Sequence, residues 1–432
     1  MNMKRTSSLV LVLLAGFVMA AFPGGQGEAP AKSAQPAQPA AAAPTTISFY
    51  CIATQTHVLY LNPLKEAFLK THPNVSLQTV EVVTGGYEAL TQKVLLSIAG
   101  GSMPDVVVTG YTDQRTMVES GHAVALDELM NADPKFNKAN QFPAALELGK
   151  SNGKQYLIPL GTSTPVMMIN EDLFQSVGLD PKKPLATWED VRQASLKLKA
   201  AGKQGVLWGW SITGNWIFQA MLEHSGGRMV NQAGTQVAFN DAAGLKVLTY
   251  LSDLTKDGLM PVTDQTLATF ISGNLGMLVD SSFQRVNTPK QCKFKVGFAG
   301  LATPDGKLPS VPAGGNGLMI FSKDAAKRQA AWEFVRFVSG EEGGRIVAGN
   351  SGYTPPNRAV ISELKAKNAS DPAYTLILNQ VERIVPWHSW PGKNSNKISK
   401  LLRDMQEAAL LGKKSPKQAL DDAAAEVNAL LK

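Results

Sequence analysis

The sequence predicts an α/β protein whose strands and helices alternate along the chain. Residues 47–53 and 75–83 are rich in β-forming side chains, and helical periodicity follows over 61–70 and 87–99. Residues 105–109 then form a short, continuous apolar run of the kind found in buried parallel strands. This β-α-β order predicts a mainly parallel sheet with helices on both faces. Ligands of such sheets bind beyond the carboxyl ends of the strands.

The 432-residue chain is long enough for two such domains. Thr187 and Asp190 fit a capping box at the start of one later helix, and Gly202 is placed to end it. Pro416 suits the first turn of the last helix. Further strands are expected over 156–159, 166–169, 275–279 and 295–299, and further helices over 188–201, 216–224, 242–256, 325–338 and 398–411.

The first 45 residues have the character of a targeting segment followed by a spacer. Lys4 and Arg5 precede an apolar run at 9–19 and small residues at 20–21, which predicts a secretory signal peptide over residues 1–20. The apolar run is too short to span a bilayer, although an uncleaved leader acting as an anchor is the alternative. Residues 21–45 are rich in Ala, Pro and Gln and predict a flexible linker. We therefore expect a periplasmic or extracytoplasmic protein.

Cysteine and charged residues exclude several classes of protein. The nearest cysteine to the leader is Cys51, beyond the linker, so a lipid anchor is not expected. Cys51 and Cys292 are the only two cysteines, and we expect them not to be bonded to each other because they fall in different predicted domains. The net charge is +7, but the basic residues form no stripe with aromatic partners, which argues against nucleic-acid binding.

The sequence lacks the motifs of common catalytic and metal sites. It has no nucleophile elbow, zinc helix or phosphate-binding loop, and its five histidines are dispersed. No metal or cofactor is therefore expected. Carboxylates are numerous, so composition alone leaves a glycoside-cleaving enzyme open.

Tryptophans gather in two irregular segments. Trp208, Trp210 and Trp216 lie in one, and Trp387 and Trp390 lie in the other, which together hold five of the seven tryptophans. A tryptophan in a loop offers a flat apolar face and one N–H donor, which suits stacking on a sugar or glycerol unit. The alternative is that these rings cover small cores beneath the loops.

Five short motifs occur in an order that resembles the extracellular solute-binding proteins of ABC importers. The last of them, residues 412–420, closely resembles the glycerol-3-phosphate-binding branch of that family. The motifs lie at residues 84–90, 276–282, 314–321, 351–357 and 412–420. The resemblance implies a binding protein without catalytic activity and without a cofactor. It also implies that the protein acts as a monomer and passes its small-molecule ligand to a membrane permease.

The same resemblance implies a two-lobed periplasmic-binding-protein fold, in which each lobe is a mainly parallel sheet flanked by helices and a hinge joins the lobes. The N-terminal lobe is expected to comprise residues 46–163 plus 314–352. The C-terminal lobe is expected to comprise residues 164–313 plus 353–432. The ligand would lie in the cleft between them.

Candidate ligand-binding residues follow from the resemblance position by position. Tyr111 stands where the glycerol-3-phosphate branch carries a glutamate, which puts recognition of the same hydroxyls in doubt. Trp216 is favoured among the tryptophans, as a stacking partner rather than a core residue. The full set is Tyr87, Tyr111, Ser163, Trp216, Ser281, Ser282, Gly315, Tyr353, Trp387 and Trp390.

A sugar or oligosaccharide is the leading ligand, and glycerol-3-phosphate or a glycerophosphodiester is the alternative. Ser399 stands at the position of the phosphate-binding arginine of the glycerol-3-phosphate branch, and serine cannot form a bidentate, charge-assisted contact. Lys397, Lys400 and Arg403 would substitute only if the helix start were shifted or rotated. A secreted glycoside-active enzyme is the alternative of a different class.

The absence of that arginine predicts weak binding of glycerol-3-phosphate. Calorimetric titration with sn-glycerol-3-phosphate should give a dissociation constant weaker than about 1 μM, or about −8 kcal/mol. A tighter constant would contradict the preference for a sugar.

Overall fold

The computed structural model describes residues 43–53, 57–183, 185–211, 215–307 and 310–431. The expected signal peptide and all but the last three residues of the expected linker lie outside these described residues. Within them, no helix has the length and apolar character needed to cross a membrane.

The first sheet is mixed and has six strands. Strand β1 pairs in parallel with β2 and β3, whereas β11 runs parallel to β12 and antiparallel to β3 and β6. The order is β12-β11-β3-β1-β2, with β6 also paired to β11. The strands are β1 (Thr45–Ile52), β2 (Val75–Val83), β3 (Val106–Gly110), β6 (Leu157–Ser163), β11 (Val311–Ile320) and β12 (Ile384–Pro386).

The second sheet has four strands in the order β10-β7-β9-β8. Only β8 and β9 pair in parallel, while β9 with β7 and β7 with β10 pair antiparallel. The expectation of a mainly parallel sheet is therefore wrong for this lobe, because returning strands pair beside the β-α-β unit. These strands are β7 (Pro165–Asn170), β8 (Gln204–Trp208), β9 (Leu275–Ser281) and β10 (Val296–Gly300), and β4 (Lys150–Ser151) with β5 (Lys154–Gln155) forms a separate hairpin.

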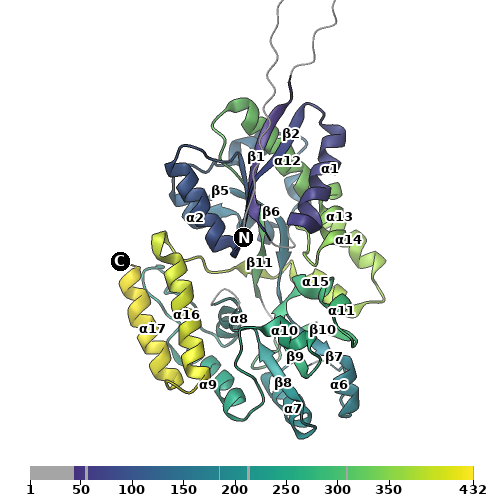
Figure 1. Cartoon of the computed structure of the whole chain (residues 1–432), viewed down its shortest axis with the longest axis vertical. Coiled ribbons are helices and arrows are strands. Elements are labelled where there is room, and N and C mark those ends of the chain that lie inside the picture. The colour runs from purple at the N-terminus through teal and green to yellow at the C-terminus, as the bar shows by residue number, and fades with distance from the viewer. Residues whose placement is uncertain (1–42, 54–56, 184, 212–214, 308–309, 432) are drawn as a thin grey trace, which may run out of the picture. The chain divides into compact units, whose positions relative to one another are not determined.

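Helices surround both sheets (Figure 1). Those placed early in the chain are η1 (His57–Leu61), α1 (Asn62–Thr71), α2 (Gly86–Ala99), α3 (Gln114–Glu119), α4 (Asp127–Ala132), η2 (Lys138–Asn140), α5 (Pro143–Glu147), α6 (Glu171–Ser176), α7 (Trp188–Ala200) and α8 (Trp216–His224). The later ones are α9 (Ala242–Lys256), α10 (Thr266–Ile271), η3 (Ser282–Arg285), α11 (Thr288–Gln291), α12 (Ala325–Ser339), α13 (Glu341–Asn350), α14 (Arg358–Lys367), α15 (Pro372–Gln380), η4 (Gly392–Asn394), α16 (Ser395–Leu410) and α17 (Pro416–Leu430).

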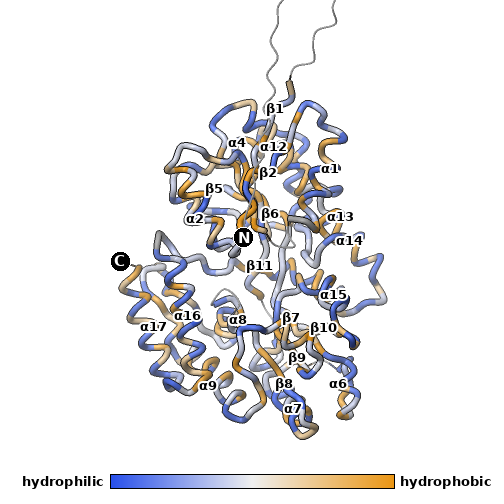
Figure 2. The backbone as a smooth tube through the Cα atoms, in the orientation of Figure 1, coloured by the Kyte–Doolittle hydropathy of each residue, from blue (hydrophilic) through white to orange (hydrophobic). Residues whose placement is uncertain are grey.

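Alternating side chains of β1 enter two different cores, as expected for a strand covered on both faces. Ile47 and Phe49 join one core with α1 and α12, and Tyr50 and Ile52 join the other with α2. The core of the second lobe packs its sheet against α7, α8, α9, α16 and α17, and α16 and α17 lie side by side. Figure 2 shows the hydrophobic colour along the strands of both sheets, where these cores lie. The first lobe is hereafter the part built on the first sheet, and the second lobe the part built on the second.

The helix ends predicted from local sequence signals are confirmed. The side chain of Thr187 accepts a hydrogen bond from the backbone N–H of Asp190, and the Asp190 carboxylate accepts one from the N–H of Thr187. This reciprocal pair is the predicted capping box. Gly202 follows α7 in a left-handed conformation with φ 71°, and the side chain of Ser415 caps α17.

The chain passes between the sheets through a very short connection. Strand β6 ends at Ser163 and β7 begins at Pro165, so Thr164 alone joins them. The lobe boundaries as a whole stay a prediction, but two observations bear on them. Strand β11 begins at Val311, ahead of residue 314. Strand β12 lies in the region expected in the C-terminal lobe but pairs with the first sheet.

Cys51, on β1, and Cys292, beside α11, are both free thiols.

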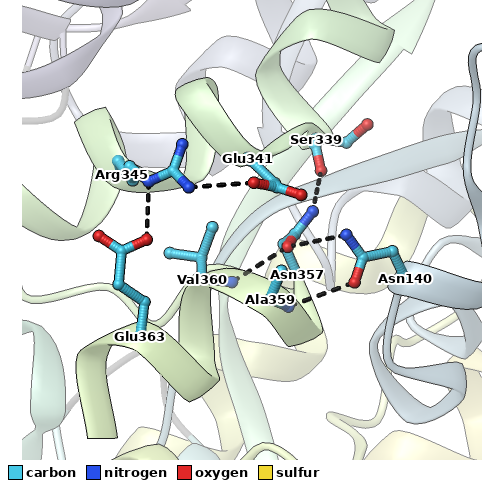
Figure 3. A network of polar contacts seen from close by, with 8 residues as sticks. All are labelled: Asn140, Ser339, Glu341, Arg345, Asn357, Ala359, Val360 and Glu363. Atoms are coloured by element: carbon cyan, nitrogen blue, oxygen red, sulfur yellow. Dashed lines mark hydrogen bonds and ion pairs between the residues drawn. The ribbon is translucent and has the colours of Figure 1, made fainter. Parts of the chain in front are cut away.

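A buried asparagine fixes the chain where it returns from the first lobe, as Figure 3 shows. Asn357 is 1 % exposed and caps α14 by accepting a hydrogen bond from the N–H of Val360. Its amide also donates to the carbonyl of Ser339 at 3.3 Å and its oxygen accepts from Asn140 at 3.2 Å. Asn140 in turn accepts from the N–H of Ala359. Three separate segments are therefore tied to one side chain.

We expect Asn357→Ala to destabilise the fold by roughly 2 to 3 kcal/mol. The loss of a helix N-cap costs about 1 kcal/mol, and the buried partners left without a hydrogen bond add about 1 to 2 kcal/mol. Urea denaturation of the wild type and the variant measures the difference. Asn350→Ala, at an exposed asparagine in the last turn of α13, is the control, and equal effects of the two substitutions would contradict the network argument.

Candidate functional site

A cavity of about 320 Å³ is lined by residues from both lobes. Gly85 to Glu88 and Gly110 to Asp113 contribute from the first lobe, and α8, β9 and the segment 387–403 contribute from the second. Eight of the ten candidate residues meet at this cavity. They are Tyr87, Tyr111, Ser163, Trp216, Ser281, Gly315, Trp387 and Trp390.

The other two candidates, Ser282 and Tyr353, are not among the residues that line the cavity. Ser282 is 1 % exposed, and its hydroxyl accepts a hydrogen bond from the N–H of Thr164 at 3.0 Å. It therefore fixes the connection between the sheets. The ring of Tyr353 packs against Tyr60 and Phe283, with ring centres 6.0 and 4.6 Å away, and burial raises the pKa of Tyr353 to about 12. Both residues therefore hold the segments around the cavity in place rather than line it.

Glycines allow the aromatic wall of the first lobe to form. Gly85 and Gly86 have φ values of 100° and 83°, so the chain turns sharply into α2 and places Tyr87 in its first turn. A Cβ atom on Gly110 would lie 2.8 Å from the ring of Tyr87. Only glycine at this strand end lets the tyrosine ring approach so closely.

The two tyrosines of this wall already use their hydroxyl groups within the protein. The Tyr87 hydroxyl accepts a hydrogen bond from Asn316 at 2.8 Å, and burial raises its pKa well above the usual value. The Tyr111 hydroxyl donates to the carbonyl of Gly161 at 2.9 Å. Tyr111 therefore offers the cavity an aromatic ring rather than a free polar group.

A carboxylate that sequence reasoning missed lies beside them. Asp113 lines the cavity and accepts hydrogen bonds from the hydroxyls of Thr112 and Thr91 at 2.9 and 3.3 Å. Burial raises its pKa to about 6. A carboxylate thus lines the cavity two residues after Tyr111, the position at which the family resemblance implies an acid. Ligands of α/β sheets bind beyond the carboxyl ends of the strands. The position of Asp113 shortly after the buried strand β3 could therefore have identified it as a candidate from the sequence.

The tryptophan wall comes from two segments distant in sequence. The rings of Trp216 and Trp387 lie 5.7 Å apart at 34°, and Trp387 donates to the side-chain oxygen of Asn215 at 3.2 Å. Trp216 is 2 % exposed, donates to the carbonyl of Pro312 at 2.9 Å and belongs to the second-lobe core. The expectation that the Trp216 ring is a stacking partner rather than a core residue is therefore wrong. The ring lines the cavity and is also part of the hydrophobic core. Trp208 and Trp210 belong to that core and do not line the cavity.

Two buried donors at the cavity have no acceptor among the described residues. They are Nε1 of Trp390, which is 3 % exposed, and Nδ2 of Asn215, which is 2 % exposed. Nε2 of His388 is likewise without a partner there, and burial lowers the pKa of His388 to about 4, so the ring is neutral at physiological pH. Unpaired buried donors cost free energy, which an incoming acceptor would recover.

Helix α16 brings a cation to the same cavity. The helix begins at Ser395, three residues before its expected start. Ser399 lines the cavity, and so does Arg403, one helical turn later on the same face. No ion pair or hydrogen bond of Arg403 with another described residue occurs in the structure. Arg403 thus brings a guanidinium to the cavity one helical turn from Ser399, the position at which the family resemblance implies an arginine. Among the described residues, no cluster of acidic, histidine and cysteine side chains is suited to hold a metal ion.

The sequence profile of the bacterial extracellular solute-binding proteins matches residues 54–345. Together with the two sheets and the cavity between them, this match shows that the chain belongs to that family, whose members are the solute-binding components of ABC importers. The family resemblance seen in the sequence is confirmed.

Two relatives with similar sequences are periplasmic binding proteins. The chain is similar to the sn-glycerol-3-phosphate-binding periplasmic protein UgpB of Pectobacterium atrosepticum, with 27% identity over 86% of this chain and 88% of the relative. UgpB of Salmonella typhimurium is 25% identical over 91% and 94% of the two chains.

Solved structures confirm the two-lobed α/β fold. The cyclic alpha-maltosyl-1,6-maltose binding protein of Arthrobacter globiformis superposes with a TM-score of 0.76 at 22% identity, over 90% of this chain and 99% of that one. UgpB of Mycobacterium tuberculosis in complex with glycerophosphocholine superposes with a TM-score of 0.79 at 19% identity, over 89% and 98%.

The raised pKa of Asp113 predicts a pH-dependent stability difference. The folded protein binds this proton more tightly than the unfolded chain, so Asp113 contributes stability below about pH 4 that is lost as the pH rises through about 6. Relative to the wild type, Asp113→Asn should therefore gain on the order of 1 to 3 kcal/mol between pH 4 and 7. Urea denaturation at several pH values measures this difference.

The comparison with wild type is needed because His388, whose pKa is lowered, acts in the opposite direction over the same pH range. Asp280 provides a control, since burial also raises its pKa to about 6 but it does not line the cavity. Asp280→Asn should change stability in the same way without changing ligand binding. A pH-independent difference for Asp113→Asn would show that its carboxyl is not desolvated.

Proposed function

We propose that this protein captures a sugar or oligosaccharide in the cavity between its lobes and delivers it to a membrane permease. The observation that carries the proposal is the pairing of an aromatic wall, Trp216, Trp387 and Trp390, with the carboxylate of Asp113 around one cavity. A sugar ring has apolar C–H faces that stack on aromatic rings and hydroxyl groups that donate to carboxylates. Such a ligand uses both features at once.

The unpaired donors favour a ligand rich in oxygen atoms. Trp390 and Asn215 supply buried N–H groups without acceptors among the described residues, and sugar hydroxyl and ring oxygens can accept from them. Because these donors belong to the second lobe and Asp113 to the first, one ligand would contact both. Those extra contacts would favour the closed arrangement of the lobes, which the permease would recognise.

A phosphorylated glycerol, either glycerol-3-phosphate or a glycerophosphodiester, is the second candidate. The specific observation in its favour is Arg403, a guanidinium at the cavity with no ion-pair partner among the described residues. The names of the UgpB relatives point the same way. Against it, Asp113 and Glu88 place two carboxyl groups around the same cavity.

The remaining functional expectations are part of this proposal. The protein acts as a monomeric binding protein without enzymatic activity and without affinity for nucleic acid. Its leader directs export and is cleaved near Ala20, which leaves a mature protein outside the cytoplasm.

A thermal-shift screen followed by calorimetry tests the proposal. A panel of mono- and disaccharides, sn-glycerol-3-phosphate and glycerophosphocholine is offered to the purified protein, since a ligand that binds only the folded state raises its melting temperature. A sugar hit without product formation supports the proposal. Binding of the phosphorylated glycerols alone would replace it with the second candidate, and steady release of a cleaved sugar would reveal an enzyme.

Trp387→Ala should weaken binding of the sugar found in this screen by roughly 1 to 3 kcal/mol, the cost of losing an aromatic stacking partner. Trp387 is only partly buried, so the fold should change little. Trp216→Ala should lose affinity and also roughly 3 to 5 kcal/mol of stability, because this ring is in the core. Calorimetry and thermal melting on both variants separate the effects. Unchanged affinity in Trp387→Ala would exclude stacking at this wall.

Arg403→Gln distinguishes the two candidate ligands. A phosphate held by the guanidinium should bind at least tenfold more weakly to the variant, equivalent to about 1.4 kcal/mol. A neutral sugar should lose less than about threefold. Lys400→Gln, at an exposed lysine three residues earlier on the same helix, serves as the control, and calorimetric titration gives the dissociation constants.

A further inference from the structure

Trp387 lies where the chain leaves the first sheet. Strand β12 ends at Pro386, the residue before it, and pairs with β11 of the first sheet. The ring of Trp387 nevertheless lies beside that of Trp216, which begins α8 and belongs to the core of the second lobe. The backbone around Trp387 must therefore be held against α8 if the two rings are to form one wall of the cavity.

The side chain of Gln219, on α8, holds this backbone on both sides of Trp387. Its Nε2 donates to the carbonyl of Pro386 at 3.3 Å, and its Oε1 accepts from the N–H of His388 at 2.9 Å. Gln219 is 2 % exposed, so these bonds replace bonds that the backbone would otherwise make to water. A single amide thus pairs with the two peptide groups that flank the tryptophan.

The partners of Gln219 permit only one orientation of its amide. Its Nε2 also donates to Glu223 at 2.7 Å, one turn further along α8. The carboxylate of Glu223 and the carbonyl of Pro386 accept hydrogen bonds, whereas the N–H of His388 can only donate one. A reversed amide would lose all three bonds. The orientation of Gln219, and with it the position of the segment around Trp387, is therefore fixed.

Asn215 adds a contact to the indole ring itself. It lies one turn before Gln219, and its backbone carbonyl accepts from the N–H of Gln219 at 2.7 Å. Its side-chain oxygen accepts from Nε1 of Trp387 at 3.2 Å. The backbone on either side of Trp387 and its indole are thus both bound to one end of α8, next to Trp216.

We propose that Gln219 is the positioning residue of the tryptophan wall. It does not line the cavity of about 320 Å³, but it fixes Trp387 beside Trp216 and thereby sets the affinity of that cavity. The proposal rests on the proposed function and adds to it a residue that acts only through the position of Trp387.

Gln219→Met tests the proposal, because methionine is similar in size and suits a helix but makes none of the three hydrogen bonds. Fluorotryptophan is incorporated into the full chain, and the fluorine NMR signal of Trp387 is assigned with Trp387→Phe. In Gln219→Met this signal should shift or broaden, whereas that of Trp332, in the first-lobe core, should not change.

Calorimetry with glucose, galactose, mannose, maltose and lactose gives the effect on binding. The sugar that binds the wild type should bind Gln219→Met more weakly by about fivefold or more.

Gln155→Met is the matched control. Gln155 is 2 % exposed, and its Nε2 donates to the carbonyls of Leu146 and Leu157 at 2.9 and 2.7 Å in the first lobe. Loss of buried hydrogen bonds should lower the melting temperature of both variants. Only Gln219→Met should move the Trp387 signal and weaken sugar binding. Equal effects of the two substitutions on signal and binding would give Gln219 a merely structural role and overturn the proposal.

A second set of variants provides the test if Gln219→Met does not fold. Gln219→Glu places two carboxylates in contact and should displace Trp387. Combined with Glu223→Gln, the new carboxylate again has a side-chain donor and still accepts from the N–H of His388. The double variant should therefore recover part of the lost sugar affinity and move the Trp387 signal back toward its wild-type position. Recovery of neither would overturn the proposal.

The fluorine signal and the binding constant separate this proposal from the proposed function. An unchanged Trp387 signal in Gln219→Met would overturn the positioning role, whatever the affinity. A shifted signal with unchanged sugar affinity would overturn the link between the position of the ring and binding. Failure of every sugar to bind the wild type would overturn the proposed function, and a shifted signal would then still support the role of Gln219 in fixing Trp387.

Discussion

Strand β11 pairs with three strands of the first sheet, and its glycines set how closely they approach. A Cβ atom on Gly315 would lie 2.2 Å from the carbonyl oxygen of Gly161, and one on Gly317 would lie 2.2 Å from the side chain of Leu157. Between them, Asn316 is fully buried and donates to the hydroxyls of both Tyr60 and Tyr87. The spacing of the sheet and the position of the tyrosine wall therefore depend on three consecutive residues, Gly315, Asn316 and Gly317. A Cβ on the preceding residue, Gly314, would lie 3.0 Å from the ring of Trp216, so the tryptophan wall depends on the same strand.

The cavity combines groups that are costly to bury without a ligand. Each unpaired buried donor destabilises the protein by about 1 to 3 kcal/mol, and Trp390 and Asn215 each carry a donor that has no acceptor in the described part of the chain. Asp113 adds a desolvated carboxyl on the opposite wall. A ligand that supplies acceptors on one side and hydroxyl donors on the other would offset these costs. The polar groups of the site therefore suit a polar solute, even though its walls are largely aromatic.

Solved structures named for a cyclic maltosyl-maltose and for glycerophosphocholine share the two-lobed fold of this chain. In this chain, aromatic rings and backbone glycines form the walls of the cavity, and charged side chains lie among them. Ser399 and Arg403 lie one turn apart on α16, and Asp113 lies on the loop after β3. Under the proposed function, these charged side chains would decide between a neutral sugar and a phosphate, because the sheets do not depend on them.

The sequence by itself determined the elements whose signals are local. Apolar periodicity located most strands and helices, and the Thr187–Asp190 pair identified a helix start, because caps and periodicity depend on neighbours within a few residues. Tertiary structure decided which strands pair. The antiparallel partners in the second sheet and the joining of β12 to the first are contacts between segments far apart in the chain, which no local pattern encodes. For the same reason, only the fold could bring Asp113 and Arg403 to the cavity, place Ser282 and Tyr353 behind it, and put Trp216 in the core and the cavity wall at once.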